Sequence, residues 1–408
     1  MSVEAFSTVM EFNRNPAHAP SLSREAELLI ACGATCASDQ PPGSIEDLAA
    51  TRVDWDLFLR MACGHGMSSI AERALAAHTK LVPVSIMADL HMRRVSVMAR
   101  DLYLANELLT VVELLEKGGV RALAFKGPSL GALAYCETGM REFSDLDILV
   151  APAARSSARQ TLIAHGYRPK CLDQRVIESP IFQCIEEPFV AADGVTLVDL
   201  HWRMLPRYSN FPADDLLWQR ARPIMLRRRP VTTLAVEDLL LFLCLHGAKH
   251  GWPLLSWICD LAGLIARSAS QGFPIDWQVL NSRAESINSR RSLLLGLGLA
   301  HNLMNAAVPS DLTAEFRADA IASSLAQRVI RAMFRNFGDR RGLSQELIIP
   351  LQSLESSREK IRYLAGRAFT PTLDDWLAMP LRAAFFPLFY LTRPLRLGFA
   401  QASTLRRK

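Results

Sequence analysis

Residues 144–150 constrain the fold more than any other segment of this chain. They read Ser-Asp-Leu-Asp-Ile-Leu-Val, a short run that is apolar except for a serine and two alternating carboxylates. Successive side chains of a strand point to opposite faces, so we expect Asp145 and Asp147 to share one face. The apolar residues that follow Asp147 predict a buried strand. The chain therefore needs a sheet that buries this strand and a partner that neutralises two neighbouring carboxylates.

Segments on either side of residues 144–150 predict the rest of a small sheet. Residues 120–125 form a short apolar run that we interpret as a strand, and Lys126-Gly127-Pro128 then turns into a helix. A helix is expected over 152–165. Residues 187–190 and 195–201 predict a hairpin, with Asp193-Gly194 at its turn.

Helical patterns lie on both sides of this sheet in the sequence. Residues 84–117 contain no Pro or Gly and repeat apolar residues at helical spacing, and Gly118-Gly119 suits the end of a helix. After Pro206 the chain is predicted to be helical again, near 237–246, 257–267, 290–306 and 314–337. We predict an α+β fold, a small mixed-sheet core flanked by N-terminal and C-terminal helical lobes. The expected divisions are 1–118, 119–205, 206–345 and a basic amphipathic tail, 346–408.

Composition narrows the class of protein. The net charge of +5 is mild for 408 residues, which argues against a nucleic-acid partner, and Arg227-Arg228-Arg229 is expected to be a solvated loop. Eight scattered cysteines are typical of reduced thiols in a cytoplasmic protein. Residues 1–20 lack the pattern of a secretory signal, and we find no run of about 18 uncharged apolar residues that would span a membrane.

The carboxylates indicate metal-dependent chemistry. Oxygen ligands suit Mg²⁺ or Mn²⁺, which would neutralise Asp145 and Asp147. Asp199 lies in a similar apolar segment, 196–200. If the two strands are neighbours, three carboxylates converge, an arrangement suited to two-metal attack on phosphorus, with Asp199 as a ligand or general base. The alternative for Asp199 is an aspartate at a strand end that pairs with an arginine.

The turn at Gly127 is a candidate phosphate site. A helix that begins directly after a strand presents N–H groups to an anion, and Lys126 and Ser129 would add a charge and a hydroxyl. Arg141 is placed to reach a phosphate or to hold the aspartate segment. Ser144, beside the carboxylates, is a further candidate for nucleotide binding.

Together, residues 125–127, 140–147 and 199–202 resemble the uncharacterised nucleotidyltransferase family, part of the DNA polymerase β-like superfamily. The resemblance implies that Gly127 is the motif glycine, that Asp145 and Asp147 bind the metal, and that Asp199 is the third carboxylate. Pro128 stands where the superfamily usually has Gly or Ser. Residues 245–252, with Asp260, resemble the helical second lobe of the family, whose substrates are mostly unassigned and whose genes often neighbour those for polysaccharide or modified-peptide biosynthesis.

Four more polar residues have competing interpretations. His201 would orient Asp199 or touch substrate, or else pack beside a core tryptophan. His246 and His250 are four residues apart, so they share a helix face. That spacing can bind zinc, although the glutamate of a zinc motif is missing. We prefer a helix that lines the nucleotide cleft, with Lys249 on the triphosphate; the alternative is a solvated polar face.

These observations predict transfer of a nucleoside monophosphate from a nucleoside triphosphate to a hydroxyl or phosphate of an unknown small molecule, saccharide or peptide. Two alternatives stay open: phosphoryl or pyrophosphoryl transfer at the same site, and a degenerate member of the fold that only binds. The aromatic and basic residues of the tail permit peripheral membrane contact. The alternative, which we favour, is a tail packed on the helical lobe.

Overall fold

The computed structural model describes residues 22–37, 44–135, 137–170, 173–182, 184–206, 211, 215–335 and 343–405. These residues include a five-stranded sheet in the order β1-β2-β5-β4-β3. The strands are β1 (Ala122–Ala124), β2 (Asp145–Val150), β3 (Arg168–Pro169), β4 (Glu186–Val190) and β5 (Leu197–His201). Among these five strands of the described residues, only β2 and β5 pair in parallel, so the predicted mixed sheet is confirmed.

The predicted hairpin is also confirmed. β4 and β5 pair in antiparallel fashion from Glu186 opposite His201 to Val190 opposite Leu197. The Asp193 carboxylate accepts the backbone N–H groups of both Val195 and Thr196 at 2.9 Å. An aspartate that binds its own backbone fixes a turn, so the sequence alone locates this one.

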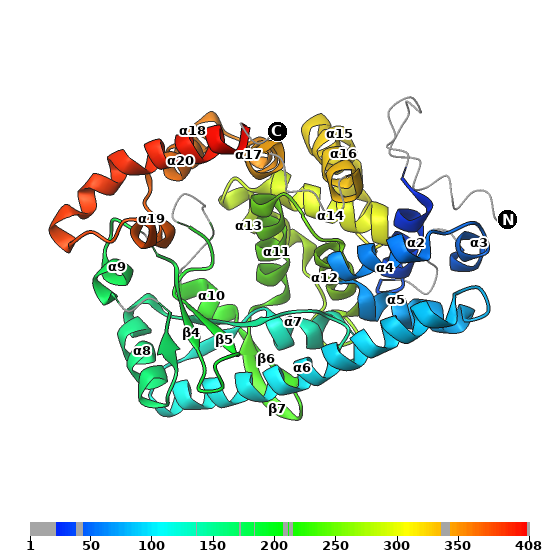
Figure 1. Ribbon diagram of the computed structural model, residues 1–408, viewed down its shortest axis with the longest axis horizontal. Helices are drawn as coiled ribbons and strands as arrows, with labels where there is room; N and C mark the ends of the chain where they lie inside the picture. The colour runs from blue at the N-terminus through cyan, green and yellow to red at the C-terminus, as the bar shows by residue number, and fades with distance from the viewer. Residues whose placement is uncertain are drawn as a thin grey trace.

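In Figure 1 the sheet lies toward one end of the molecule, and most of the helices lie beside and above it. Those before it are α2 (Arg24–Ala34), α3 (Ile45–Ala49), α4 (Trp55–Gly64), α5 (Ser68–Leu75), the short η2 (Ala76–His78) and α6 (Val84–Lys117). Those between the strands are α7 (Gly127–Ala134), η3 (Pro152–Ala154), α8 (Arg155–Ala164) and α9 (Gln174–Glu178). Those after it are α10 (Asp215–Arg220), α11 (Val236–His250), α12 (Leu255–Arg267), α13 (Trp277–Ser286), α14 (Arg290–Met304), α15 (Ser310–Ala318), α16 (Ala320–Arg335) and α17 (Leu343–Ser353).

The prediction of helix throughout the segment after Pro206 was wrong in one place. β6 (Arg222–Leu226) and β7 (Arg229–Thr233) form a separate two-stranded sheet between α10 and α11. Arg227 and Arg228 form its turn with positive φ angles of 49° and 65°. Such a turn usually carries Asn or Gly, and the arginines gave no signal for it.

The single helix expected over 314–337 was also wrong, because α15 and α16 are separate helices divided at Asp319. This residue has extended backbone angles, φ −77° and ψ 95°, which no helix continues through. Its carboxylate accepts the N–H groups of Ile321 and Ala322 at 2.9 and 3.0 Å, so Asp319 caps α16.

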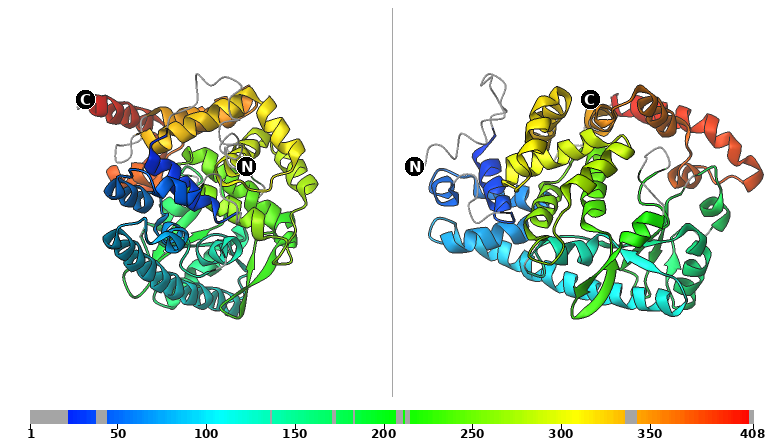
Figure 2. Two further views of the ribbon diagram at one scale, coloured as in Figure 1. Left: turned by 90° about the vertical axis from the view of Figure 1, so that its right-hand side faces the viewer. Right: turned by 180° about the vertical axis from the view of Figure 1, so that it is seen from behind.

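Two hydrophobic cores meet along α6, which runs along one edge of the molecule (Figures 1 and 2). The larger core unites α2–α5 with α11–α17, so the two helical segments on either side of the sheet pack together. The second core lies between the sheet and α6 and α8. Ile86 and Leu90 of α6 belong to the first core, whereas Leu104 and Leu115 belong to the second.

The C-terminal tail consists of α18 (Ser357–Phe369), α19 (Leu373–Ala378), η4 (Ala383–Leu388) and α20 (Phe389–Leu405). Phe386 and Phe389 pack on Val176 and Ile177 of α9 and on Trp202, which follows β5. The tail therefore docks on the sheet domain as well as on the helices. None of the helices in the described residues is long and apolar enough to cross a membrane.

Candidate active site

Three aspartates meet on one face of the sheet. β2 and β5 are parallel neighbours, and their register places Asp147 opposite Asp199. Asp145 is two residues from Asp147 on the same strand and therefore shares its face. The expectation that the strand of Asp199 lies beside that of Asp147 is confirmed.

Asp147 is the most enclosed of the three, with 6% of its surface exposed. Its Oδ1 lies 3.5 Å from Lys126 Nζ and 3.1 Å from His201 Nε2. Burial alone would raise the pKa of Asp147. The Lys126 charge and the hydrogen bond to His201 outweigh burial and hold that pKa well below its usual range. Asp147 is thus an ionised carboxylate between the Lys126 ammonium and the His201 ring.

His201 joins Asp147 to a carboxylate that sequence reasoning missed. Its Nδ1 lies 3.0 Å from Glu186 Oε2, at the start of β4. Burial opposes protonation of the ring, but the hydrogen bond to Asp147 and the charge of Glu186 raise the pKa of His201 overall. His201 therefore orients Asp147 rather than Asp199. Glu186 carried no local signal, because only the β4–β5 pairing brings it to His201.

The carboxylates of Asp145 and Asp199 are less well balanced by neighbouring positive charge than that of Asp147. Burial and the charge of Asp147 raise the pKa of Asp145. Burial and the charges of Glu186 and Asp147 raise the pKa of Asp199 to about 6. The two groups border an ionised aspartate and would both gain from a further cation, and their oxygen donors suit Mg²⁺ or Mn²⁺. In its donor chemistry this set fits a divalent metal, although no group of three or more His, Cys, Asp or Glu in the described residues is already gathered around a metal position.

The segment that leads into β2 is fixed from two sides. Arg100 of α6 donates to the carbonyl oxygens of Phe143 and Ser144, both at 3.2 Å. Gly127 has a φ of +52°, and a Cβ there would lie 3.2 Å from the Asp145 carbonyl oxygen. Glycine at 127 thus allows the turn into α7 to lie against the start of the carboxylate strand.

Arg141 is held by a buried carboxylate on α12. Its Nε donates to Asp260 Oδ1 and Oδ2 at 3.2 and 3.0 Å, and the Tyr135 hydroxyl donates to Oδ1 at 2.8 Å. The Nη1 of Arg141 has no hydrogen-bond partner among the described residues. The partnership with Asp260 was not predicted, although a carboxylate among the apolar residues of 257–267 required a buried cation nearby.

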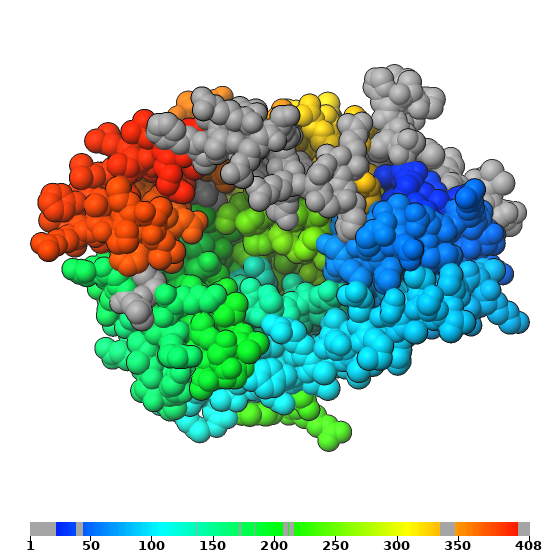
Figure 3. Space-filling view, viewed as in Figure 1, coloured from blue at the N-terminus to red at the C-terminus, as the bar shows by residue number. Residues whose placement is uncertain are grey.

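These groups border a cavity of about 450 Å³, within the range of ligand sites. Figure 3 shows the molecule hollowed on one face, between the C-terminal tail and the N-terminal helices. The lining of the cavity is Lys126, Arg141, Glu142, Phe143, Ser144, Asp145, Asp147, Leu243, His246, His250, Pro253, Leu254, Trp257 and Asp260. Seven of the residues proposed from sequence are among them, and Glu142 is fixed by a hydrogen bond from Ser68 of α5.

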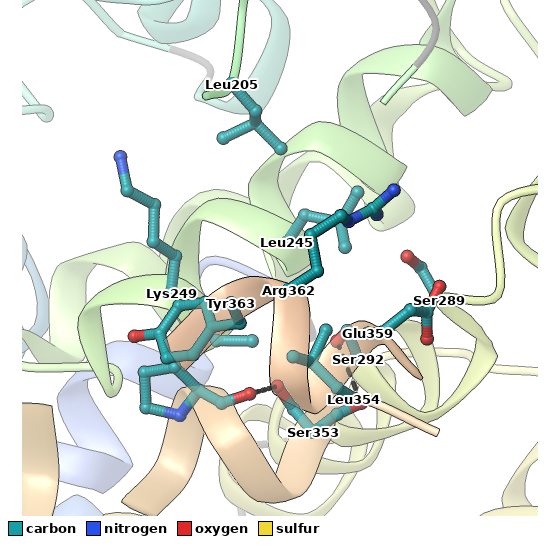
Figure 4. A pocket seen from close by; sticks show the side chains of 12 residues that line it. Leu205, Leu245, Lys249, Ser289, Ser292, Ser353, Leu354, Glu359, Arg362 and Tyr363 are labelled. Carbon is teal, nitrogen blue, oxygen red and sulfur yellow. Dashed lines mark hydrogen bonds between the residues drawn. The ribbon is translucent and has the colours of Figure 1, made fainter. Parts of the chain in front are cut away.

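Other candidates lie elsewhere. Ser129 is fully buried, so its hydroxyl does not face the cavity. Lys249 borders a different pocket of about 40 Å³ with Ser353, Arg362 and Tyr363. Figure 4 shows the Lys249 ammonium pointing away from the other labelled side chains there. Asp199 and His201 lie beside Asp147 and are not part of the cavity lining.

Comparison with known proteins identifies the family. A family model described as uncharacterised nucleotidyltransferase matches residues 51–305, more than half of the chain. The chain belongs to the uncharacterised nucleotidyltransferase family. A search of curated proteins found no match. The matched segment of this nucleotidyltransferase runs from before α4 to the end of α14, so it contains the carboxylate strands and the whole lining of the cavity. Helices α15–α20 lie beyond it.

Proposed function

We propose that this nucleotidyltransferase moves a nucleoside monophosphate from a nucleoside triphosphate to a hydroxyl or phosphate acceptor and releases pyrophosphate. The register of β2 and β5 carries the proposal, because it sets Asp147 beside Asp199 with Asp145 on the same face. Lys126 and Arg141 enter the same cavity. Carboxylates beside cations suit a polyphosphate that binds together with a divalent metal.

Each aspartate has a proposed role. Asp145, Asp147 and Asp199 would hold Mg²⁺ or Mn²⁺, which when bound neutralises phosphate charge and activates the attacking oxygen. His201 keeps the Asp147 carboxylate in place. Asp199 is alternatively proposed to accept the proton of the acceptor hydroxyl as a general base.

The two cations are proposed to bind phosphate oxygens. Lys126 reaches Asp147 through one contact of 3.5 Å, which leaves its other N–H groups available to a phosphate. Arg141 is oriented by Asp260 through Nε, and its side chain lines the cavity, where it would meet a phosphate group. A guanidinium fixed in this way binds phosphate without losing much side-chain entropy.

The test is turnover by single variants. Asp145→Asn, Asp147→Asn and Asp199→Asn should each lower transfer by about 10³-fold or more, because metal ligation supplies several kcal/mol of transition-state stabilisation. Transfer is followed with triphosphate labelled at the α- or the γ-phosphate, together with candidate acceptors. Asp193→Asn, in the β4–β5 turn, is the matched control and should retain activity.

The labels separate the three candidate functions. Transfer of the α-label supports nucleotidyl transfer, and transfer of the γ-label would replace it with phosphoryl transfer. Nucleotide binding without turnover across the acceptors would favour a protein that only binds. Full activity in all three Asn variants would refute the role of the carboxylates.

We also propose that the tail makes peripheral contact with an anionic membrane surface. Phe385, Leu388, Leu391 and Leu395 recur every three or four residues along η4 and α20 and are 46–69% exposed. Arginines accompany them, among them the exposed Arg382. An apolar stripe with basic neighbours is typical of helices that lie at a lipid interface.

Co-sedimentation with vesicles tests the membrane contact. Binding should require phosphatidylserine and should fall in Leu391→Ser/Leu395→Ser. Val84→Ser/Met92→Ser, two exposed apolar positions on α6, is the matched control and should bind normally. Equal binding by both double variants would refute the proposal.

A further inference from the structure

Three aromatic rings form a continuous wall of the cavity. We call His246, His250 and Trp257 the aromatic wall. The ring centroids are 4.6 Å apart for the two histidines, 4.9 Å for His246 and Trp257, and 5.9 Å for His250 and Trp257. All three residues line the cavity, together with the apolar Leu243, Pro253 and Leu254. The lining of the cavity therefore combines an apolar and aromatic part with the charged residues Arg141, Asp145 and Asp147.

The connection between α11 and α12 holds the wall in place. Trp252 is 1% exposed and has a φ of 51°, a left-handed conformation that bulky residues rarely adopt. A Cβ on Gly247 would lie 2.5 Å from the Trp252 indole, so glycine lets this ring pack directly on the α11 backbone. The backbone N–H of Trp252 also donates to the Gly247 carbonyl oxygen at 2.9 Å. A strained turn enclosed in this way fixes the start of α12 and therefore the position of Trp257 in its first turn.

The chemistry of the wall suits a planar, uncharged ligand group. Burial, together with the nearby charge of Lys126, holds the pKa of His246 well below its usual range, so this ring is neutral at neutral pH. The wall offers indole and imidazole faces and no carboxylate. Phosphate groups would instead favour Lys126 and Arg141, and a cation would favour the aspartates.

We propose that the aromatic wall binds the base of the nucleoside triphosphate by stacking, while the triphosphate lies toward Lys126, Arg141 and the aspartates. This inference rests on the proposed function and adds the position of the base. The cavity volume of about 450 Å³ lies within the range for small-molecule and cofactor sites. Stacking tolerates every base, because each has a π-face.

Calorimetry with two kinds of ligand tests the wall. The full-length protein is titrated, with Mg²⁺ present, with each of the four common nucleoside triphosphates and with inorganic tripolyphosphate, which has no base. Trp257→Ala should weaken nucleotide binding by about tenfold or more, the usual effect of removing one stacking partner. Its affinity for tripolyphosphate should not change. Trp257→Phe keeps an aromatic face and should retain most of the nucleotide affinity.

The outcomes separate this inference from the function on which it rests. Unchanged nucleotide affinity in Trp257→Ala, or an equal loss for nucleotide and tripolyphosphate, would overturn the stacking role while leaving the proposed reaction intact. Failure of the wild type to bind either ligand would overturn both. If Trp257→Ala does not fold, Trp257→Leu keeps the bulk without the π-face and should show the same selective loss.

Discussion

The charges of the cavity are arranged in pairs whose members come from different elements. Lys126, at the start of α7, meets Asp147 of β2, and Arg141, ahead of β2, meets Asp260 of α12. Asp145 borders the same cavity without a comparable ion pair among the described residues. A ligand that brings a cation would balance the charge of Asp145. The unpaired carboxylate therefore indicates a cation-containing ligand.

Asp260 should matter for stability as much as for the site. Asp260→Asn leaves the Arg141 guanidinium nearly buried without its counter-charge, and breaking such a pair costs about 3–5 kcal/mol. We expect the free energy of unfolding, measured in urea, to fall by that amount. Tyr135→Phe removes only the hydroxyl that donates to Asp260, so it is the milder control, at about 1 kcal/mol. Equal losses in the two variants would contradict the importance of the ion pair.

Sequence reasoning located the residues of the site better than their partners. Asp145 and Asp147 were found because alternation along a single strand is a local pattern. Asp260 lies 119 residues from Arg141, so no local pattern links the two. Ser129 and Lys249 were assigned from helix position alone. The packing of each helix decides which of its faces meets the cavity, and sequence spacing does not contain that information.

At the scale of elements, the turn between β1 and α7 determines where β2 begins. Gly127→Ala should destabilise the protein in two ways, through a left-handed backbone and through contact with the Asp145 carbonyl oxygen at 3.2 Å. Gly119 has a φ of +74° and nothing within 4 Å of an added Cβ. Gly119→Ala should therefore cost only the backbone strain, about 1–2 kcal/mol.

Unfolding and turnover of the two glycine variants test this difference. Gly127→Ala should lose more stability than Gly119→Ala, and it alone should lower turnover, since it displaces the carboxylate strand. If the two variants lose equal stability and retain equal turnover, then Gly127 has no special role at the site.

The elements that were predicted correctly have residues at their ends that are typical of a helix end or a turn. The bounds of α6 follow from an uninterrupted helical pattern that ends at Gly118-Gly119, and Asp193-Gly194 locates the β4–β5 turn. The β6–β7 hairpin was missed because arginines occupy a turn that glycine usually makes. The break before α16 had a readable signal, since Asp319 is a common type of helix N-cap.

At the scale of the whole molecule, one aspartate holds the tail together. The Asp375 carboxylate accepts hydrogen bonds from Thr372 and Arg393, and from Arg396 at 2.6 Å. Burial alone would raise the pKa of Asp375, but the hydrogen bonds from Thr372 and Arg393 and the Arg393 charge lower it overall. The ionised form is therefore favoured by folding, and its contribution is complete above the unfolded pKa of about 4. This contribution to stability is lost as the pH falls through the lower pKa that Asp375 has in the folded state.

A pair of neighbouring variants tests this dependence. Asp375→Asn should destabilise the tail by about 3 kcal/mol at neutral pH and flatten the acid side of the stability curve. Asp374→Asn, at an exposed position, should change neither. Hydrogen exchange of α18–α20 across the pH range reports the result. A tail that exchanges alike in both variants would contradict the role of Asp375.

The predicted order of helices, sheet and helices is correct along the chain, but it does not show how the parts join. The larger core takes Ala26 and Phe58 from the first segment and Leu240 and Leu297 from the third. Pairing between segments more than 150 residues apart depends on complementary packing of whole surfaces, for which a single sequence gives no direct signal.

The position of α6 in both cores bears on how the molecule loses its structure. Its first turns are fixed among the N-terminal and C-terminal helices, and its last turns lie under the sheet. Melting α6 would expose apolar surface in both cores at once, so neither core has an independent boundary at residue 118. We therefore expect the N-terminal helices, the sheet and α11–α16 to unfold in one cooperative transition. A chain that begins at Gly119 would lack α6, so the strand that carries Asp145 and Asp147 would lose the helix on which it packs.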